Sequence, residues 1–305
     1  MRLVTYGPPN GEEPGVLIGD HLLLPLRPVL GRAGLHIAEM GDLLGLWPAV
    51  EALVRQAVVA GDGAVPLDGL RLGPPVPRPG KIVAIGFNYP QHATGVLSGA
   101  EPAGDPVVFL KPPSALSGPN DPLVKPPETT QLDYELELGV VIGRACRRVR
   151  RQDAQAHVAG YMIANDATAR DIALGAGASN PLLLQIARGK GFPTFCPTGP
   201  WLLTSDEIDP GRPLRLTLSV NGERRQDAWT SSMLVDVPGL IASVSATMDL
   251  FPGDLILTGS PAGCAFQLDP PGYLHDGDRI QAAITGLGHM DLVVRDEVPD
   301  PLTVS

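Results

Sequence analysis

The amino-acid sequence predicts a mainly β fold with some helix, built as a rolled sheet or barrel-like sandwich with a small N-terminal domain. Three observations predict this class. Short apolar segments with alternating or β-branched patterns outnumber helical patterns along the chain. Glycine (36 residues) and proline (33 residues) are scattered through the 305 positions without a period, which indicates many turns and excludes collagen. Many strands with few helices favour a rolled sheet over a doubly wound fold.

The small N-terminal domain is expected to span residues 1–75. Residues 2–6 and 15–25 have the pattern of short strands on either side of a turn. Farther along, apolar residues recur at helical spacing and predict one amphipathic helix. The proline-dense stretch 73–80 then marks the boundary to a second domain over residues 76–305.

The second domain is predicted to consist mostly of strands. One helix is expected over residues 238–250, where apolar side chains share one face and a proline lies in the first turn. Turns such as Asn221-Gly222 separate neighbouring strands. The strands are expected at residues 82–85, 107–110, 134–142, 160–165, 214–220, 254–257, 279–284 and 292–295.

Composition and motifs exclude several classes of function. The formal net charge is −10, which opposes binding to phosphate backbones, so no nucleic-acid partner is expected. The segment Gly189-Lys190-Gly191 lacks P-loop spacing, and the sequence contains neither a dinucleotide-binding fingerprint nor G-x-S-x-G. An NTPase or a serine hydrolase is therefore not indicated.

Cysteine usage and hydropathy predict a cytoplasmic protein. The three cysteines form no C-x-x-C pair, which indicates a reducing compartment and argues against structural zinc. The first residues lack the apolar core of a signal peptide, and no uncharged apolar run of about 18 residues occurs that would cross a membrane.

Two glutamates stand two residues apart in an otherwise apolar segment. If this segment is a strand, Glu135 and Glu137 share one face about 6.6 Å apart, while Leu136 and Leu138 face the other way. Adjacent carboxylates repel, and an apolar strand tolerates them when a cation lies between them. A later apolar strand ends at Asp166, and three carboxylates suit Mg²⁺ or Mn²⁺. On the glutamate pair alone, an edge strand with exposed glutamates fits equally well.

A series of sequence blocks between about Lys81 and Val294 resembles the fumarylacetoacetate hydrolase family. No single block is decisive, but their common order is specific. The resemblance implies the family fold, a β-rich roll that usually forms homodimers. The blocks are Gly86 to His92, Pro106 to Leu116, Glu135 to Glu137, Asn165 to Asp171, Lys190 to Phe192, Val220 to Glu223, Thr230 to Met233 and Leu257 to Gly263.

The same resemblance implies a metal site and a lysine beside it. It identifies Glu135, Glu137 and Asp166 as ligands of Mg²⁺, with Mn²⁺ or Ca²⁺ as alternatives. Lys190 matches the family's lysine at the charged oxygens of the substrate, where an ammonium group stabilises an enolate or a carboxylate. A surface lysine in a glycine-flanked loop is the alternative for Lys190.

Two further residues are implied to bind substrate. Arg170 matches the arginine four residues past the aspartate ligand, although an ion pair with Asp171 or with a partner subunit fits as well. Ser260 stands where many relatives have threonine, and its hydroxyl would hold a carboxylate. A plain turn is the alternative for Ser260.

His92 is the implied base that activates water. Many relatives carry a glutamate three residues later to orient this histidine, whereas this sequence has Gly95. Glu101 lies in the same glycine-rich stretch, which has the character of a mobile lid, and is the candidate to replace that glutamate.

The sequence therefore predicts a divalent-metal-dependent hydrolase. Its substrate would be a 2,4-dioxo acid, such as an acylpyruvate or a fumarylacetoacetate-like intermediate of aromatic or small-acid breakdown, whose carbon–carbon bond is cleaved. The departure at Gly95 keeps a decarboxylase, isomerase, hydratase or lyase acting on a related 2-oxo acid as the alternative. A metabolite-binding family member without turnover is the alternative outside the enzymes.

Overall fold

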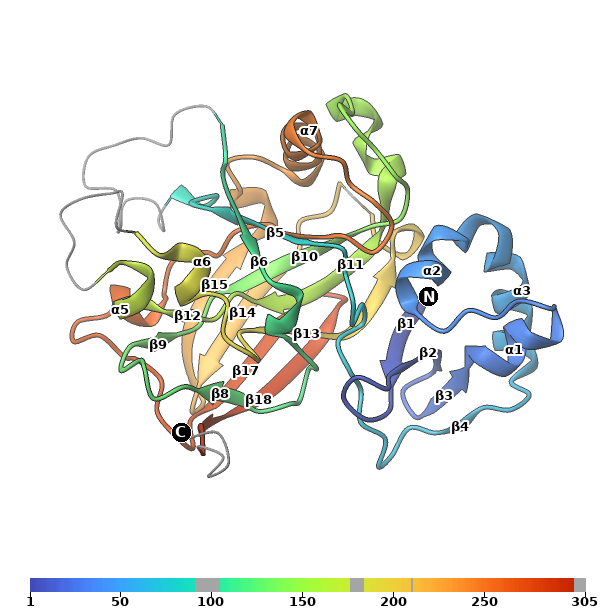
Figure 1. The fold of residues 1–305 in the computed structure, drawn as a ribbon, viewed down its shortest axis with the longest axis horizontal. Coiled ribbons are helices and arrows are strands. Elements are labelled where there is room, and N and C mark those ends of the chain that lie inside the picture. Colours follow the sequence, from blue (N-terminus) through green and yellow to red (C-terminus); the bar gives the residue numbers. More distant parts are fainter. Residues whose placement is uncertain (91–104, 176–183, 210, 299–305) are drawn as a thin grey trace, which may run out of the picture.

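The computed structural model describes residues 1–90, 105–175, 184–209 and 211–298. Sheets dominate and a few helices cover them, so the prediction of a mainly β fold with some helix is confirmed (Figure 1). The strands are β1 (Arg2–Tyr6), β2 (Glu13–Ile18), β3 (Leu22–Pro25), β4 (Val65–Pro66), β5 (Ile82–Gly86), β6 (Val107–Lys111), β7 (Leu116–Ser117), β8 (Leu123–Lys125), β9 (Leu132–Asp133), β10 (Leu136–Ile142), β11 (Val158–Asn165), β12 (Thr168–Ala169), β13 (Cys196–Thr204), β14 (Arg215–Val220), β15 (Glu223–Trp229), β16 (Leu255–Leu257), β17 (Arg279–Ile284) and β18 (Gly288–Asp296). The α-helices are α1 (Leu26–Arg32), α2 (Met40–Gly45), α3 (Trp47–Ala60), α5 (Arg170–Ala173), α6 (Ile186–Gly189) and α7 (Val237–Thr247).

The strands form one large sheet, one smaller sheet and a short two-stranded pair. The large sheet has the order β4-β3-β2-β1-β13-β11-β10-β16-β5-β6, and β7 pairs with β13 beside this path. The smaller sheet has the order β15-β14-β17-β18-β8, and β12 pairs with β9. Most pairs are antiparallel, but β5 and β16 run parallel, so both end at the same edge of the large sheet.

The two faces of the large sheet carry different cores. Strand alternation places Leu138 and Val140 of β10 in the larger core, where they meet Leu216 of β14 and Ile280 of β17 from the smaller sheet. The opposite face of the large sheet packs against the N-terminal helices in a second core. That core contains Ile82, Ala84, Val141, Met162, Ala164 and Leu257 together with Leu26, Leu30, Leu43, Leu44, Val50 and Val54.

The N-terminal residues share their sheet with the rest of the chain. Strand β1 pairs antiparallel with β13, where Arg2 lies opposite Leu203. Strands β2, β3 and β4 extend this edge outward, and α1, α2 and α3 cover the second core on the right of Figure 1. The first predicted domain, residues 1–75, continues the sheet of the second, residues 76–305. The division into two domains stays a prediction.

Several elements differ from the sequence expectations. Strand β13 was not expected because Pro197 and Pro200 interrupt its apolar run. It is nevertheless a central strand, and Pro200 falls where the pairing with β11 is irregular, between Gly199 opposite Ile163 and Leu203 opposite Tyr161. Helices α1 and α2 were also not expected, since glycine and proline within them lower helix propensity. Among the described residues, no helix is long and apolar enough to cross a membrane.

Candidate metal centre

Antiparallel pairing of β10 with β11 brings the three predicted ligands together. Leu136 lies opposite Asn165, and the backbone N–H of Asp166 donates a hydrogen bond to the carbonyl of Glu135 at 2.8 Å. Glu137 lies opposite Ala164 on the next pair. One carboxylate oxygen from each of the three acidic residues lies within 4.8 Å of the other two. Asp166 therefore meets Glu135 and Glu137, 31 and 29 positions earlier, because β11 ends beside the start of β10.

The alternation expected for this segment holds, although the strand is shorter than predicted. Strand β10 begins at Leu136, one residue after Glu135. The N–H of Glu135 donates to the side-chain oxygen of Asn165 and not to a backbone carbonyl of a neighbouring strand. Leu136 and Leu138 lie in the larger core, as expected for side chains that face away from the two glutamates.

The three carboxylates are buried. Glu135 is 4% exposed, and Glu137 and Asp166 are each 1% exposed, which excludes the alternative of an exposed edge strand. Burial, followed by the charges of Asp166 and Glu135, raises the pKa of Glu137 well above its ordinary value. Negative charge is therefore crowded where Glu137 lies, the setting in which a cation is most strongly favoured.

Lys190 lies beside the carboxylates and not on the surface. It directly follows α6, and its Nζ donates hydrogen bonds to Glu135 Oε2 and Asp166 Oδ2, each at 2.5 Å. It is 6% exposed, so the alternative of a surface lysine is wrong. The preceding Gly189 permits this placement, because a Cβ there would lie 2.5 Å from the Cβ of Ala173 in α5. Burial alone would lower the pKa of Lys190, but the charges of Asp166 and Glu135 outweigh it and raise the pKa.

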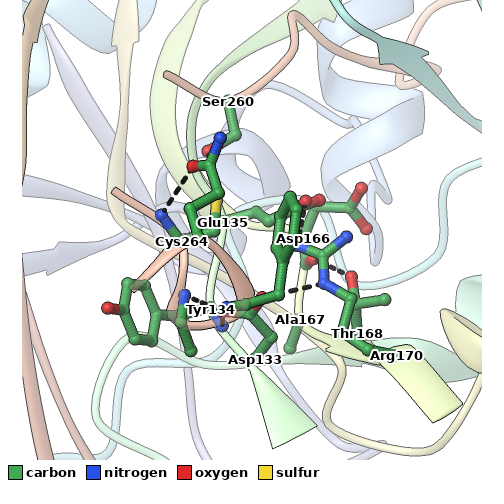
Figure 2. A network of polar contacts seen from close by, with 12 residues as sticks. Asp133, Tyr134, Glu135, Asp166, Ala167, Thr168, Arg170, Ser260 and Cys264 are labelled. Atoms are coloured by element: carbon green, nitrogen blue, oxygen red, sulfur yellow. Dashed lines mark hydrogen bonds and ion pairs between the residues drawn. The ribbon is translucent and has the colours of Figure 1, made fainter. Parts of the chain in front are cut away.

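Arg170 is tied to acidic residues inside the protein (Figure 2). Its Nε donates to Asp133 Oδ2 at 2.8 Å and its Nη2 donates to Glu135 Oε1 at 2.5 Å. The guanidinium also lies 4.4 Å from the ring centre of Phe266. The alternative partner Asp171 instead accepts hydrogen bonds from Thr129 and from the backbone of Thr130. Arg170 therefore holds Glu135 in place, and its predicted contact with substrate stays a prediction.

Asp133 anchors this arginine and was not singled out from the sequence. It is fully buried, and it also accepts hydrogen bonds from the backbone N–H groups of Tyr134 and Ala265, both at 2.7 Å. Its position two residues before Glu135 continues the same alternation. That spacing is the signal that would have identified it.

A second lysine, Lys111, lies in the site beside Lys190. Unlike Lys190, it was not predicted from the sequence. It ends β6, its side chain is fully buried, and its Nζ lies 2.6 Å from Asp166 Oδ1 in an ion pair. The same ammonium donates to the main-chain carbonyl of Lys190 at 2.6 Å. The available signal was a lysine at the end of an apolar strand within the block Pro106 to Leu116, because a buried lysine requires an acidic partner.

Ser260 lies near the site but its hydroxyl is engaged by other groups. Its Oγ accepts a hydrogen bond from Gln226 Nε2 at 2.9 Å and donates to the carbonyl of Pro261 at 3.3 Å. The neighbouring Gly259 donates its N–H to Glu137 Oε2 at 2.7 Å. Substrate binding by Ser260 stays a prediction, while its loop contacts the predicted metal ligand Glu137 through Gly259.

The predicted base and its partner lie outside the described residues. His92, Gly95 and Glu101 all fall in the segment 91–104, so their predicted roles rest on the resemblance alone. The three cysteines are buried and form no disulfide in the described part of the chain. Burial raises the pKa of Cys196 to about 12.

The donor set fits a hard divalent ion. All three predicted ligands offer carboxylate oxygens, which Mg²⁺, Mn²⁺ and Ca²⁺ prefer over nitrogen or sulfur. Asp166 Oδ1 receives no hydrogen bond of good geometry within the described part of the chain, although Lys111 lies beside it. A buried carboxylate oxygen without a hydrogen bond has coordination capacity to spare.

Comparison with known proteins identifies the relatives of this chain. A 2,4-didehydro-3-deoxy-L-rhamnonate hydrolase from Sphingomonas sp. (strain SKA58) is 38% identical over 295 residues, which cover 94% of each chain. A mitochondrial oxaloacetate tautomerase from Bos taurus is 36% identical over 294 residues, which cover 94% of this chain and 90% of the relative. Both relatives act on small acids.

A solved structure and a family model extend the comparison. Maleylpyruvate hydrolase from Sphingobium sp. SYK-6, in complex with manganese(II) and pyruvate, is 34% identical with a TM-score of 0.78 and covers 98% of this chain and 100% of its own. Residues 81–295 match the model of the fumarylacetoacetate (FAA) hydrolase C-terminal domain. With this match over most of the chain and the fold in agreement, the chain belongs to the fumarylacetoacetate hydrolase family of enzymes.

Proposed function

We propose that this protein is a divalent-metal-dependent hydrolase that cleaves a carbon–carbon bond in a 2,4-dioxo acid. The observation that carries the proposal is the buried carboxylate triad, whose oxygens lie within 4.8 Å of one another and whose members Glu135 and Asp166 both contact Lys190. Relatives that act on small acids, one of them solved with manganese(II) and pyruvate, support the same class of substrate.

The residues of the site would divide the reaction between them. Glu135, Glu137 and Asp166 would hold the divalent ion, which supplies a Lewis acid for the 2-oxo acid group. Water would add to the acyl carbon, the adjacent carbon–carbon bond would break, and its electron pair would leave as a pyruvate enolate that then takes up a proton. Lys190 would stabilise the negative charge of that enolate, because its ammonium already lies among the ligand carboxylates.

His92 is proposed as the base that takes a proton from the attacking water, and Glu101 as the group that orients it. For Arg170 the contacts support positioning of Glu135 rather than direct substrate binding, because two of its nitrogens already donate to Asp133 and Glu135. Ser260 is proposed to meet the substrate carboxylate at the end of the Gly259 loop.

A second candidate function is a decarboxylase, isomerase or tautomerase acting on a related 2-oxo acid. The specific observation in its favour is Gly95, which stands where many relatives carry the glutamate that completes the water-activating pair. The similarity to an oxaloacetate tautomerase agrees with this alternative. These reactions need the ion and the enolate but no attack by water.

Metal analysis of Glu137→Ala tests the site. We expect the purified wild type to bind one Mg²⁺ or Mn²⁺ per chain, and the variant to lose both metal and activity. Full metal occupancy in the variant would show that the ion lies elsewhere. Assays of the wild type with acylpyruvates and with oxaloacetate separate an enzyme from a family member that only binds metabolites.

His92→Ala separates the two reaction classes. We expect this variant to keep its metal and to lose carbon–carbon hydrolysis by roughly 10²- to 10⁴-fold, the usual contribution of general base catalysis. Enolisation or decarboxylation of oxaloacetate should survive better. Wild-type hydrolysis of acylpyruvates by His92→Ala would remove the histidine from the mechanism.

We also propose that the protein is a homodimer. The exposed apolar side chains of β6 support an interface, since Val107, Val108 and Leu110 are 50%, 39% and 49% exposed on the last strand of the large sheet. Light scattering of the wild type and of Val108→Lys measures the oligomeric state. The identity of the ion as Mg²⁺ and a cytoplasmic location stay predictions.

A further inference from the structure

Tyr89 differs from other buried tyrosines of this chain. The hydroxyl of Tyr134 donates to the carbonyl of Gly263 at 3.1 Å, and the hydroxyl of Tyr161 donates to Gln155 Oε1 at 3.0 Å. Tyr89 is 2% exposed, yet its hydroxyl has no hydrogen-bond partner among the described residues. Buried tyrosine hydroxyls normally find a partner, since a buried donor left unpaired is destabilising.

The backbone just before Tyr89 has an unusual conformation. Strand β5 ends at Gly86, and the next residue, Phe87, has a φ of +58°, in the left-handed region that a bulky residue seldom adopts. Such backbone strain persists where surrounding contacts enforce it, and it is concentrated at functional sites. Asn88, between Phe87 and Tyr89, is held by three side-chain hydrogen bonds.

Asn88 fastens the segment to the loop that contacts Glu137. Its Nδ2 donates to the carbonyl of Thr258 at 2.8 Å, and Gly259, the next residue, donates its N–H to Glu137 Oε2. The approach is close, because a Cβ at Gly259 would lie 2.8 Å from the Cβ of Asn88. Parallel pairing of β5 with β16 explains the meeting, since both strands deliver their following loops to one edge of the sheet.

Glu137 is the charged group that acts on Tyr89. Burial first, and then the negative charge of Glu137, raises the pKa of the Tyr89 hydroxyl. The hydroxyl therefore keeps its proton near neutral pH and can donate it in a hydrogen bond. Tyr89 thus combines an unused donor, burial and proximity to a metal-ligand carboxylate.

We propose that Tyr89 is a substrate-binding residue, whose hydroxyl donates a hydrogen bond to a carbonyl or carboxylate oxygen of the 2-oxo acid held beside Glu137. This inference rests on the proposed function, because it names a further contact at the same site. Lys190 contacts the Glu135 and Asp166 carboxylates, and Tyr89 supplies a neutral donor on the side of Glu137. The unpaired hydroxyl lowers the stability of the free protein, and bound substrate removes that cost.

Tyr89→Phe tests the proposal, because it removes the hydroxyl and keeps the ring. Pyruvate binding to the Mn²⁺-loaded protein is measured by titration calorimetry, alongside Mn²⁺ affinity and the melting temperature of the metal-free protein. We expect a pyruvate Kd roughly 10- to 100-fold higher than that of the wild type. This increase corresponds to the loss of one hydrogen bond to a charged group. Mn²⁺ affinity should be unchanged, and the melting temperature should be equal to or higher than that of the wild type.

Tyr161→Phe is the matched control, because it removes the same atom from a paired buried tyrosine in β11. It should lower the melting temperature and leave the pyruvate Kd unchanged. A wild-type pyruvate Kd in Tyr89→Phe would overturn the proposal and leave a water molecule as the partner of the hydroxyl. Destabilisation or misfolding of Tyr89→Phe would also overturn it, because the hydroxyl would then have a structural partner.

The same measurements separate this inference from the proposed function. If the wild type binds neither Mn²⁺ nor pyruvate, the proposed function fails and the role of Tyr89 fails with it. If the wild type binds both and Tyr89→Phe binds them equally well, only the role of Tyr89 is wrong.

Discussion

Glu135 and Glu137 are two residues apart in sequence, yet the two sides of the site that they occupy differ in their electrostatics. Glu135 accepts hydrogen bonds from Arg170 and Lys190. Glu137 accepts one from the backbone N–H of Gly259, and no Lys or Arg of the described chain forms an ion pair with it. Two carboxylates on the same face of one segment therefore differ. Glu135 lies against two cationic side chains, and Glu137 lies against a backbone N–H.

The difference shows how one site can be both rigid and ready for a ligand. On the Glu135 side, the charges alternate through Asp133, Arg170, Glu135, Lys190 and Asp166, each pair closed by a hydrogen bond. On the Glu137 side, the carboxyl has a raised pKa, and its charge acts on the Tyr89 hydroxyl, which has no hydrogen-bond partner among the described residues. The hydrogen bonds of the paired side hold its geometry, whereas we expect the Glu137 side to be completed when ligands bind.

Breaking the paired side should have the largest effect. Asp133→Ala leaves the buried Arg170 without one of its two acidic partners, and it also leaves the N–H of Ala265 unpaired. We expect a loss of about 3–5 kcal/mol in the free energy of unfolding, measured by urea denaturation. The matched control is Asp227→Ala, which breaks an Arg–Asp pair on the surface, where Arg215 donates two hydrogen bonds to Asp227. The control should lose less than about 1 kcal/mol, and equal losses would contradict the comparison.

Neutralising the unpaired side should affect metal binding and not folding. Glu137→Gln keeps the shape of the side chain and removes its charge, so the metal-free protein should be at least as stable as the wild type. Mn²⁺ at about 100 times its Kd should stabilise the wild type by about 2.7 kcal/mol and the variant by much less. Thermal denaturation with Mn²⁺ and with EDTA measures both quantities. Equal stabilisation of the two proteins by Mn²⁺ would place the ion away from Glu137.

Metal affinity should depend on pH through Glu137. Its pKa is raised by burial and by the neighbouring carboxylates, so in the metal-free protein a proton competes with the ion for this group. Mn²⁺ affinity should therefore rise as pH rises through the titration of Glu137, by up to about tenfold per pH unit for one released proton. Calorimetry in buffers of different ionisation enthalpy counts that proton. Binding without proton release near neutral pH would show that Glu137 is already ionised.

The smallest effect is expected at Ser260. This residue follows Gly259, which donates its N–H to Glu137. Ser260→Ala removes the acceptor for Gln226 Nε2, which still donates to the carbonyl of Pro261 at 2.8 Å. We expect a loss of about 1 kcal/mol in the free energy of unfolding. If the hydroxyl also binds substrate, the pyruvate Kd of the Mn²⁺-loaded variant should rise. An unchanged Kd would restrict Ser260 to a structural role.

The sequence by itself determined the carboxylate triad and most of the strands. Two-residue alternation placed Leu136 and Leu138 in the core and both glutamates on the opposite face, because side-chain direction in a strand is a local property. The helix predicted over residues 238–250 corresponds to α7, since its apolar face and early proline are equally local signals. The order of the family blocks identified the family for the same reason, as each block is read along the chain.

Only the tertiary structure decided which charges meet and which groups remain unpaired. Lys111 meets Asp166, and Asn88 meets the carbonyl of Thr258, because strands from distant segments become neighbours, and no spacing in the sequence states which strands do so. Strand β13 is not predicted from the sequence, because proline is unfavourable in a central strand. In the structure, the irregular pairing with β11 accommodates Pro200. A charge or a hydroxyl becomes costly or useful only once burial removes water around it, and burial is a property of the whole fold.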